Sequence, residues 1–242
     1  MSAPALVARR DRPVRWGIGD FFWVFVGGLV VSIVAGIALV AVSGWTTPLT
    51  DDQEITLTGV SGIAQFAGFA LLLFALLRFK GGGVLHDLGV FRDREVGLVL
   101  ACFVAGIVMQ FALGVLLLPI LNLDSGEGQD LVDKLEESSG TAIVMLALMA
   151  GLFAPIFEEL LFRGVLLRSL LRRMPVPAAV LVSSAVFGAV HLFDPNTFKL
   201  LPALIGMGLV SAVLAVYGGG MLRSIALHAG FNAVTVLLAI SR

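Results

Sequence analysis

Seven long apolar runs constrain this chain more than any other feature of its sequence. An α-helix needs about 20 consecutive apolar residues to cross about 30 Å of hydrocarbon. The runs are Phe21–Val42, Ile55–Leu77, Val96–Leu121, one from Thr141 that stays uncharged to Phe157, Met174–Phe193, Leu200–Tyr217 and Ser224–Ile240. The alternating pattern of a membrane β-barrel is absent. The sequence therefore predicts an all-α, polytopic transmembrane helical bundle with about seven spans.

Composition excludes the soluble classes of protein. Of 242 residues, 58% are hydrophobic and 14% charged, against about 45–50% and about 25% in soluble domains. So little polar surface cannot cover a soluble globule, which makes the lipid bilayer the expected surrounding. The net charge of −1 gives no reason to expect a nucleic-acid partner. The single cysteine, Cys102, cannot form an internal disulfide.

The basic residues predict the orientation of the bundle. If the N-terminus is cytoplasmic, thirteen of the sixteen lie on the cytoplasmic side, as the positive-inside rule requires. They are Arg9, Arg10, Arg12, Arg15, Arg78, Lys80, Arg92, Arg94, Arg163, Arg168, Arg172, Arg173 and Arg223. We expect one domain, with a cytoplasmic tail (1–20), N-terminal spans (21–140) and a C-terminal transmembrane core (141–242). The excess of arginine over lysine favours a GC-rich, bacterial source, and hence a bacterial plasma membrane.

Polar residues inside the apolar runs need a reason to be there. A charged side chain near the middle of a membrane costs at least about 2.5–3.5 kcal/mol. In the first three runs Gln110 is the main polar exception. The fourth span continues beyond Phe157 through Glu158, Glu159 and Arg163. The fifth run carries His191, and the seventh carries His228 and Asn232. This asymmetry locates the expected function in the C-terminal half.

Helical spacing separates these groups into roles. Glu159 and Arg163 are four residues apart, in the favourable order for an ion pair on one helix face. Glu158 points about 100° away from that face and has no local partner, which suits a general base. His228 and Asn232 are also four apart and can act on one ligand atom.

Structural explanations compete with each of these roles. An intramembrane His or Asn often joins helices through a hydrogen bond worth about 0.6 kcal/mol. The Glu159–Arg163 pair can satisfy itself, and Phe187 fits helix packing better than chemistry. Pro155 removes a backbone hydrogen bond and is expected to kink the fourth span beside the glutamates.

Three motifs in the C-terminal half resemble the signature of the CPBP family of intramembrane proteases, also called the ABI family. That family contains the type II CAAX prenyl endopeptidases and bacteriocin-processing or immunity proteins. The motifs are a Glu-Glu pair followed by Arg, Phe-x-x-x-His and His-x-x-x-Asn. In family order they fall on Glu158, Glu159 and Arg163, on Phe187 and His191, and on His228 and Asn232. Members often have eight spans, one more than the runs counted here.

The resemblance implies peptide-bond hydrolysis in or at the edge of the bilayer. By analogy, Glu158 and His191 would activate a water molecule, and His228 with Asn232 would stabilise the oxyanion. Glu159 and Arg163 would brace the site. The implied substrate is a peptide or membrane protein, prenylated in the case of a CAAX endopeptidase.

The sequence leaves two questions open: whether the site binds a metal ion, and whether the protein is catalytically active. Glu158, His191 and His228 would supply a His₂Glu zinc set, whereas Asn232 suits an oxyanion donor better than a zinc ligand. We therefore expect no cofactor, with zinc or another divalent metal as the alternative. A non-catalytic immunity or scaffold protein is the rival to a protease. A proton transporter is disfavoured because the polar residues occupy one half of the chain only.

One geometric condition follows from the predicted spans. Glu158 lies about 21 Å along a helix from Arg172, whereas His228 lies only five residues beyond Arg223. The two side chains can meet only if the fourth helix extends past the membrane or the seventh begins deeper.

Overall fold

A computed structural model describes residues 15–83, 85–90, 95–121, 134, 138 and 140–241. Five of the predicted cytoplasmic arginines therefore lie outside the described residues: Arg9, Arg10, Arg12, Arg92 and Arg94. Most of the predicted cytoplasmic tail also lies outside them.

Seven helical stretches are long and apolar enough to cross a membrane, which confirms the predicted all-α bundle. The first three are α2 (Ile18–Ser43), α3 (Asp51–Lys80) and α4 (Val96–Leu121). The fourth is composite: α6 (Gly140–Leu148), η2 (Met149–Phe153), α7 (Ala154–Glu159), η3 (Leu160–Leu167) and α8 (Arg168–Leu170). The others are α9 (Val176–Val190) with η4 (His191–Phe193), η5 (Pro195–Leu200) with α10 (Leu201–Tyr217), and α11 (Met221–Ile240). Within the described residues the chain forms no strand.

Local sequence sets where these helices begin and end. Thr50 and Gln53 form a capping box at the start of α3, in which each side chain bonds the other residue's backbone N–H. Gly44 ends α2 in the left-handed conformation, with φ of 66°, which a glycine adopts without strain.

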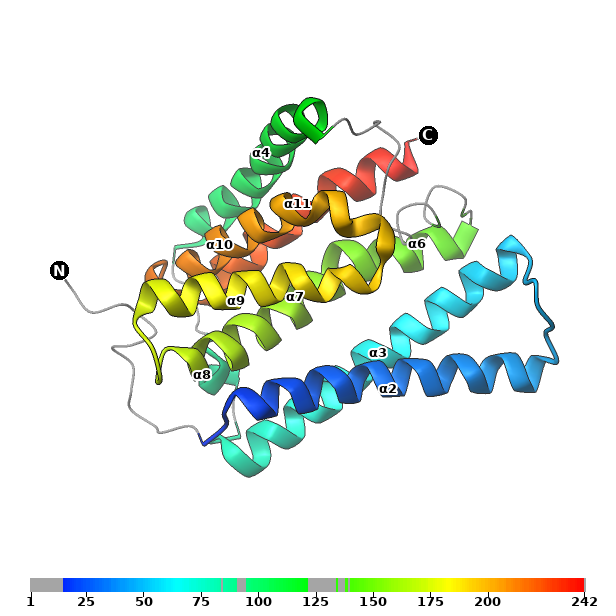
Figure 1. Cartoon of the computed structure of the whole chain (residues 1–242), viewed down its shortest axis with the longest axis horizontal. Helices are drawn as coiled ribbons and strands as arrows, with labels where there is room; N and C mark the ends of the chain where they lie inside the picture. Colours follow the sequence, from blue (N-terminus) through cyan, green and yellow to red (C-terminus); the bar gives the residue numbers. More distant parts are fainter. Residues whose placement is uncertain are drawn as a thin grey trace.

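The helices form three groups in Figure 1. The α2–α3 hairpin lies along one edge, α4 packs against α11 on the opposite edge, and the composite fourth helix, α9 and α10 lie between them. Phenylalanine rings join the hairpin to the fourth helix. Phe21 meets Phe162 edge-on with ring centroids 5.1 Å apart, and Phe66 stacks on Phe157 at 5.5 Å.

Two glycines let α4 and α11 cross at backbone distance. A Cβ atom on Gly106 would lie 2.0 Å from the carbonyl oxygen of Leu227. One on Gly230 would lie 1.9 Å from that of Phe103. Further along, Gln110 donates a hydrogen bond to Thr235 across the same pair of helices. The crossing occurs beside His228, so α4 supports the helix that carries predicted site residues.

The loops predicted to be cytoplasmic meet at one end of the bundle. The backbone N–H of Arg15 donates to the carbonyl of Lys80, and Arg172 donates to the carbonyl of Trp16. The backbone N–H of Met221 donates to the carbonyl of Gly89. This end unites the starts of α2 and α11 with the ends of α3 and α8. Which side of the membrane it faces stays a prediction.

Candidate active site

The two adjacent glutamates lie on α7, a short α-helical piece between two π-helical segments, η2 and η3. Wide π turns leave backbone groups without regular partners and often occur at functional sites. Pro155 contributes to this irregularity because it has no N–H. The N–H of Ala154 bonds to the carbonyl of Met149, so the carbonyl of Ala150 has neither of its usual helix donors. The side-chain amide of Asn232 donates to that carbonyl at 2.9 Å.

Glu159 is completely buried and its two oxygens have different partners. Oε2 accepts hydrogen bonds from the hydroxyls of Ser211, at 2.7 Å, and Ser224, and lies 3.3 Å from Nε of Arg163. Oε1 lies 3.1 Å from Nδ1 of His228. The predicted Glu159–Arg163 pair is present, but it does not satisfy itself as expected, because three further side chains complete the shell of Glu159.

His228 lies between both glutamates. Its Nδ1 faces Glu159, and its Nε2 lies 3.7 Å from Oε2 of Glu158. The prediction that Glu158 has no local partner is consistent with this contact, since His228 comes from α11. Glu158 and His228 thus meet, and the fourth helical stretch that carries Glu158 runs from Gly140 to Leu170.

Phe187 is fully buried, and its ring lies among three charged or polar groups. Its centroid lies 4.7 Å from the guanidinium carbon of Arg163, 4.9 Å from the ring of His191 and 5.6 Å from that of His228. Packing was the predicted role, and the ring of Phe187 packs against the guanidinium of Arg163 and both imidazoles. Arg163 is held further by donation to the carbonyl of Gly208 at 3.0 Å.

The orientation of His191 follows from its position at the end of α9. Its Nδ1 lies 2.8 Å from the carbonyl oxygen of Phe187, one turn earlier. A carbonyl only accepts, so Nδ1 carries the hydrogen and Nε2 of the neutral ring keeps its lone pair. His191 is partly exposed and presents Nε2 as an acceptor.

A zinc set was the alternative drawn from Glu158, His191 and His228. Among the residues that the structure describes, no three His, Cys, Asp or Glu side chains gather closely enough to hold a metal ion. Nδ1 of His228 faces Glu159, and its Nε2 lies on the side of Glu158. The mechanism proposed below has no step through a metal.

Two site residues, Ser211 and Ser224, escaped prediction. Their hydroxyls lie 2.6 Å apart and both reach Glu159. Ser224 could have been found, because Ser224, His228 and Asn232 recur every four residues and share a face of α11. Ser211 gives no comparable signal, since its helix carries none of the three motifs.

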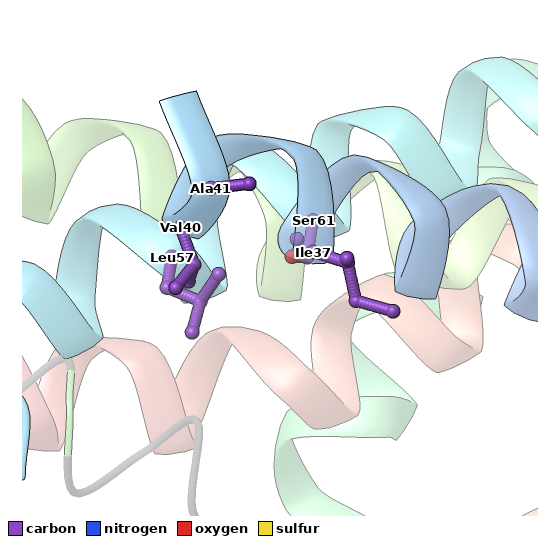
Figure 2. A pocket seen from close by; sticks show the side chains of 6 residues that line it. Ile37, Val40, Ala41, Leu57 and Ser61 are labelled. Carbon is purple, nitrogen blue, oxygen red and sulfur yellow. The ribbon is translucent and has the colours of Figure 1, made fainter. Parts of the chain in front are cut away.

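A groove elsewhere in the bundle lies between α2 and α3. It has a volume of about 470 Å³ and is lined by Gly36, Ile37, Val40, Ala41, Leu57 and Ser61. Figure 2 shows that its labelled side chains are nearly all aliphatic. It contains none of the predicted site residues and no group suited to proton transfer.

Comparison with known protein families finds a match in the C-terminal half of the chain. Residues 140–234 match the type II CAAX prenyl endopeptidase Rce1-like family. The matched stretch includes every predicted site residue, and it confirms the resemblance drawn from the three motifs. The C-terminal part of the chain is thus similar to CAAX proteases, and the whole described chain has seven helical stretches that are long and apolar enough to cross a membrane. No curated protein and no solved structure matches the chain.

Proposed function

We propose that this protein is an intramembrane endopeptidase that hydrolyses a peptide bond with water activated by Glu158. The observation that carries the proposal is the position of His228, which lies between Glu158 and Glu159 inside the stretch that matches an endopeptidase family. A carboxylate, two imidazoles and an amide are the groups that acyl transfer to water requires.

Exposure favours Glu158 over Glu159 as the base. The side chain of Glu158 is 24% exposed, whereas that of Glu159 is fully buried and its oxygens are already engaged. Only Glu158 has an oxygen free to meet a water molecule. We assign His191 to orient this water for Glu158, because Nε2 of His191 is a hydrogen-bond acceptor.

His228 and Asn232 are the proposed donors to the oxyanion. The amide of Asn232 uses one N–H on the carbonyl of Ala150, which leaves its second N–H for a substrate. Nε2 of His228 faces Glu158 and, when protonated, can donate as well. The carboxylate of Glu159 on the opposite side of the ring would then balance the charge of the doubly protonated imidazole, as a buried carboxylate does in catalytic triads.

Glu159 and Arg163 are proposed to brace the site. Both are fully buried, and Arg163 is additionally anchored on Gly208 and on the ring of Phe187. The proposed substrate is a peptide or membrane protein that reaches the site from the bilayer, and a prenylated C-terminus is the first candidate to test. We place the protein in a bacterial plasma membrane with its N-terminus in the cytoplasm.

The test compares new peptide termini by mass spectrometry of membranes from cells that express the wild type or Glu158→Gln at matched levels. Glu95→Gln is the matched control, because Glu95 carries the same carboxylate at an exposed position, where it pairs with Arg223. We expect termini that appear with the wild type and the control and vanish with Glu158→Gln. Identical profiles in all three would favour the immunity or scaffold protein instead.

The absence of a metal from the proposed reaction needs its own measurement. Once a substrate is known, cleavage by the purified protein is measured before and after dialysis against a zinc chelator, with metal content determined in parallel. We expect full activity in the metal-free protein. Activity that is lost with the metal and restored by added Zn²⁺ would replace the metal-free mechanism.

A further inference from the structure

We infer that Ser211 and Ser224 are positioning residues of the proposed reaction: through Glu159 they fix the ring orientation and tautomer of His228. The inference rests on the proposed function for its consequence in catalysis, but not for its structural content. Neither serine belongs to the three motifs, and they come from different helices, α10 and α11.

The argument begins with the hydroxyl hydrogens. Ser211, Ser224 and Oε2 of Glu159 are all within hydrogen-bond distance of one another. The two hydroxyls carry only two hydrogens for these three contacts. Either both donate to Glu159, or one donates to Glu159 and receives the hydrogen of the other. In each case at least one hydroxyl donates to Oε2.

Oε2 is thereby fully used. A carboxylate oxygen has two lone pairs in its plane, and Ser211, Ser224 and the guanidinium of Arg163 all converge on this one. Oε1 is left for His228, with its Nδ1 at 3.1 Å. The carboxylate cannot turn away from His228 without breaking the contacts on Oε2.

This division determines which nitrogen of His228 carries a hydrogen. An ionised carboxylate only accepts, so Nδ1 must donate to it. Nε2 is then the nitrogen that faces Glu158 and the reacting atoms. Without the serines, Glu159 could turn both oxygens to Arg163, the geometry that a guanidinium prefers, and Nδ1 of His228 would lose its acceptor.

The charged groups around His228 leave Glu159 as its acceptor at Nδ1. Glu158 and Glu159 face it from α7, and the ring of Phe187 contacts Arg163 of η3, His191 and His228 itself. Glu158 lies on the Nε2 side and would stabilise the opposite tautomer. Each glutamate favours the tautomer of His228 that carries the hydrogen on the nitrogen facing it. By holding Glu159 in place, the serines favour the tautomer with the hydrogen on Nδ1.

The experiment reads the tautomer directly. The chain has three histidines, so ¹⁵N-histidine labelling of the whole protein in detergent micelles gives few signals. His86→Gln and His191→Gln assign the signal of His228. Spectra at about pH 9, where an ordinary imidazole is neutral, report which ring nitrogen carries the hydrogen. The variants are Ser211→Ala, Ser224→Ala and their double.

Ser184→Ala is the matched control. Ser184 is as fully buried as the two serines, but its hydroxyl donates to the carbonyl of Val180 in its own helix. Ser224→Thr retains a hydroxyl and serves as the conservative variant. Both should keep the wild-type spectrum, with Nδ1 of His228 protonated.

In the double variant we expect a mixture of tautomers at His228. With a cleavable substrate, kcat should fall about 10- to 100-fold, with KM changed less than about twofold, because Glu159 no longer holds the doubly protonated ring of His228 that donates to the oxyanion. Lost hydrogen bonds to a charged group have effects of this size. Wild-type tautomer and wild-type kcat in a folded double variant would overturn the inference. If the wild type cleaves nothing, the proposed function fails, while the spectra still decide whether the serines fix the tautomer. If alanine unfolds the protein, Ser211→Cys and Ser224→Cys, of similar volume and weaker donors, take its place.

Discussion

The N-terminal spans and the C-terminal core of this protein are equally helical and similarly apolar, yet they are built differently. In the most apolar part of each span, the share of residues buried inside the bundle is 17% in α2, 28% in α3 and 6% in α4. It is 17% in the fourth span, 33% in the fifth and 39% in the last two. The buried polar side chains of the described spans all lie in the C-terminal core. They are Glu159, Arg163, Ser169, Ser183, Ser184, Thr197, Ser211, Ser224 and His228.

The difference follows from what each region must hold together. Apolar side chains can face lipid, so α2, α3 and α4 need few internal contacts to be stable in a bilayer. Polar side chains in hydrocarbon must find partners, and a cluster of them requires several helices to close around it. The N-terminal spans therefore enclose and support the core, and we expect substitutions in the two regions to differ in size.

The largest expected effect is that of Glu159→Gln. The substitution leaves the buried guanidinium of Arg163 without its countercharge, and breaking a buried ion pair costs about 3–5 kcal/mol. Thermal unfolding in detergent should show this loss. Glu95→Gln, in an exposed pair with Arg223, should cost about 1 kcal/mol or less. Equal shifts for the two variants would contradict the distinction between core and periphery.

The next effect lies where the two regions meet. Gly106→Ala or Gly230→Ala places a methyl group about 2 Å from a backbone carbonyl, and overpacking of this kind costs about 1–3 kcal/mol. The added methyl group should push α11 away from α4. Because α11 carries His228 and Asn232, cleavage should fall as well. Gly97→Ala and Gly114→Ala, on α4 but with open space at the added Cβ, should leave stability and cleavage unchanged. A damaging Gly114→Ala would mean that α4 makes a contact absent from this structure.

Asn232→Ala separates a structural from a catalytic role. Loss of its bond to the carbonyl of Ala150 should lower stability by about 1 kcal/mol. If Asn232 also donates to the oxyanion, kcat should fall about 100-fold or more with little change in KM. Thermal unfolding of the variant and the wild type measures the change in stability. Steady-state kinetics on the same preparations measure kcat and KM. A change in stability alone would leave Asn232 as a structural link between α11 and η2.

The smallest effect is expected for Gln110→Leu. Gln110 supplies the polar link from α4 to Thr235 of α11, and such bonds contribute about 0.6 kcal/mol on average in membrane proteins. The unfolding midpoint should move only slightly, and cleavage should persist. A loss as large as that of Gly106→Ala would show that this polar contact, rather than the glycine crossing, holds α4 in place.

Much of this protein could be read from its residues. The apolar runs match the spans to within a few residues, because crossing hydrocarbon demands a length and composition that the sequence shows directly. The exception is the end of the fourth span, which continues past Phe157 to Leu170. The i,i+4 relation of Glu159 and Arg163 is local, and the two side chains meet as predicted. The three motifs led to the family that residues 140–234 match.

The contacts between helices could not be predicted from the sequence. Nothing near Glu158 in the sequence indicates that His228, seventy residues later, lies 3.7 Å away. Ser211 has no motif to mark it, and the carbonyl that Asn232 reaches depends on how Pro155 and a π turn disturb the fourth helix.

Local spacing therefore determined the helices, the candidate residues and their pairing within each helix, since i,i+4 geometry is the same in every α-helix. Only the tertiary structure decided which oxygen of Glu159 each partner takes and that His228 joins the two glutamates. Those choices depend on the crossing of α11 with α4, α7 and α10, where glycines set the distance to α4 and buried charge has to be satisfied across the helix interfaces.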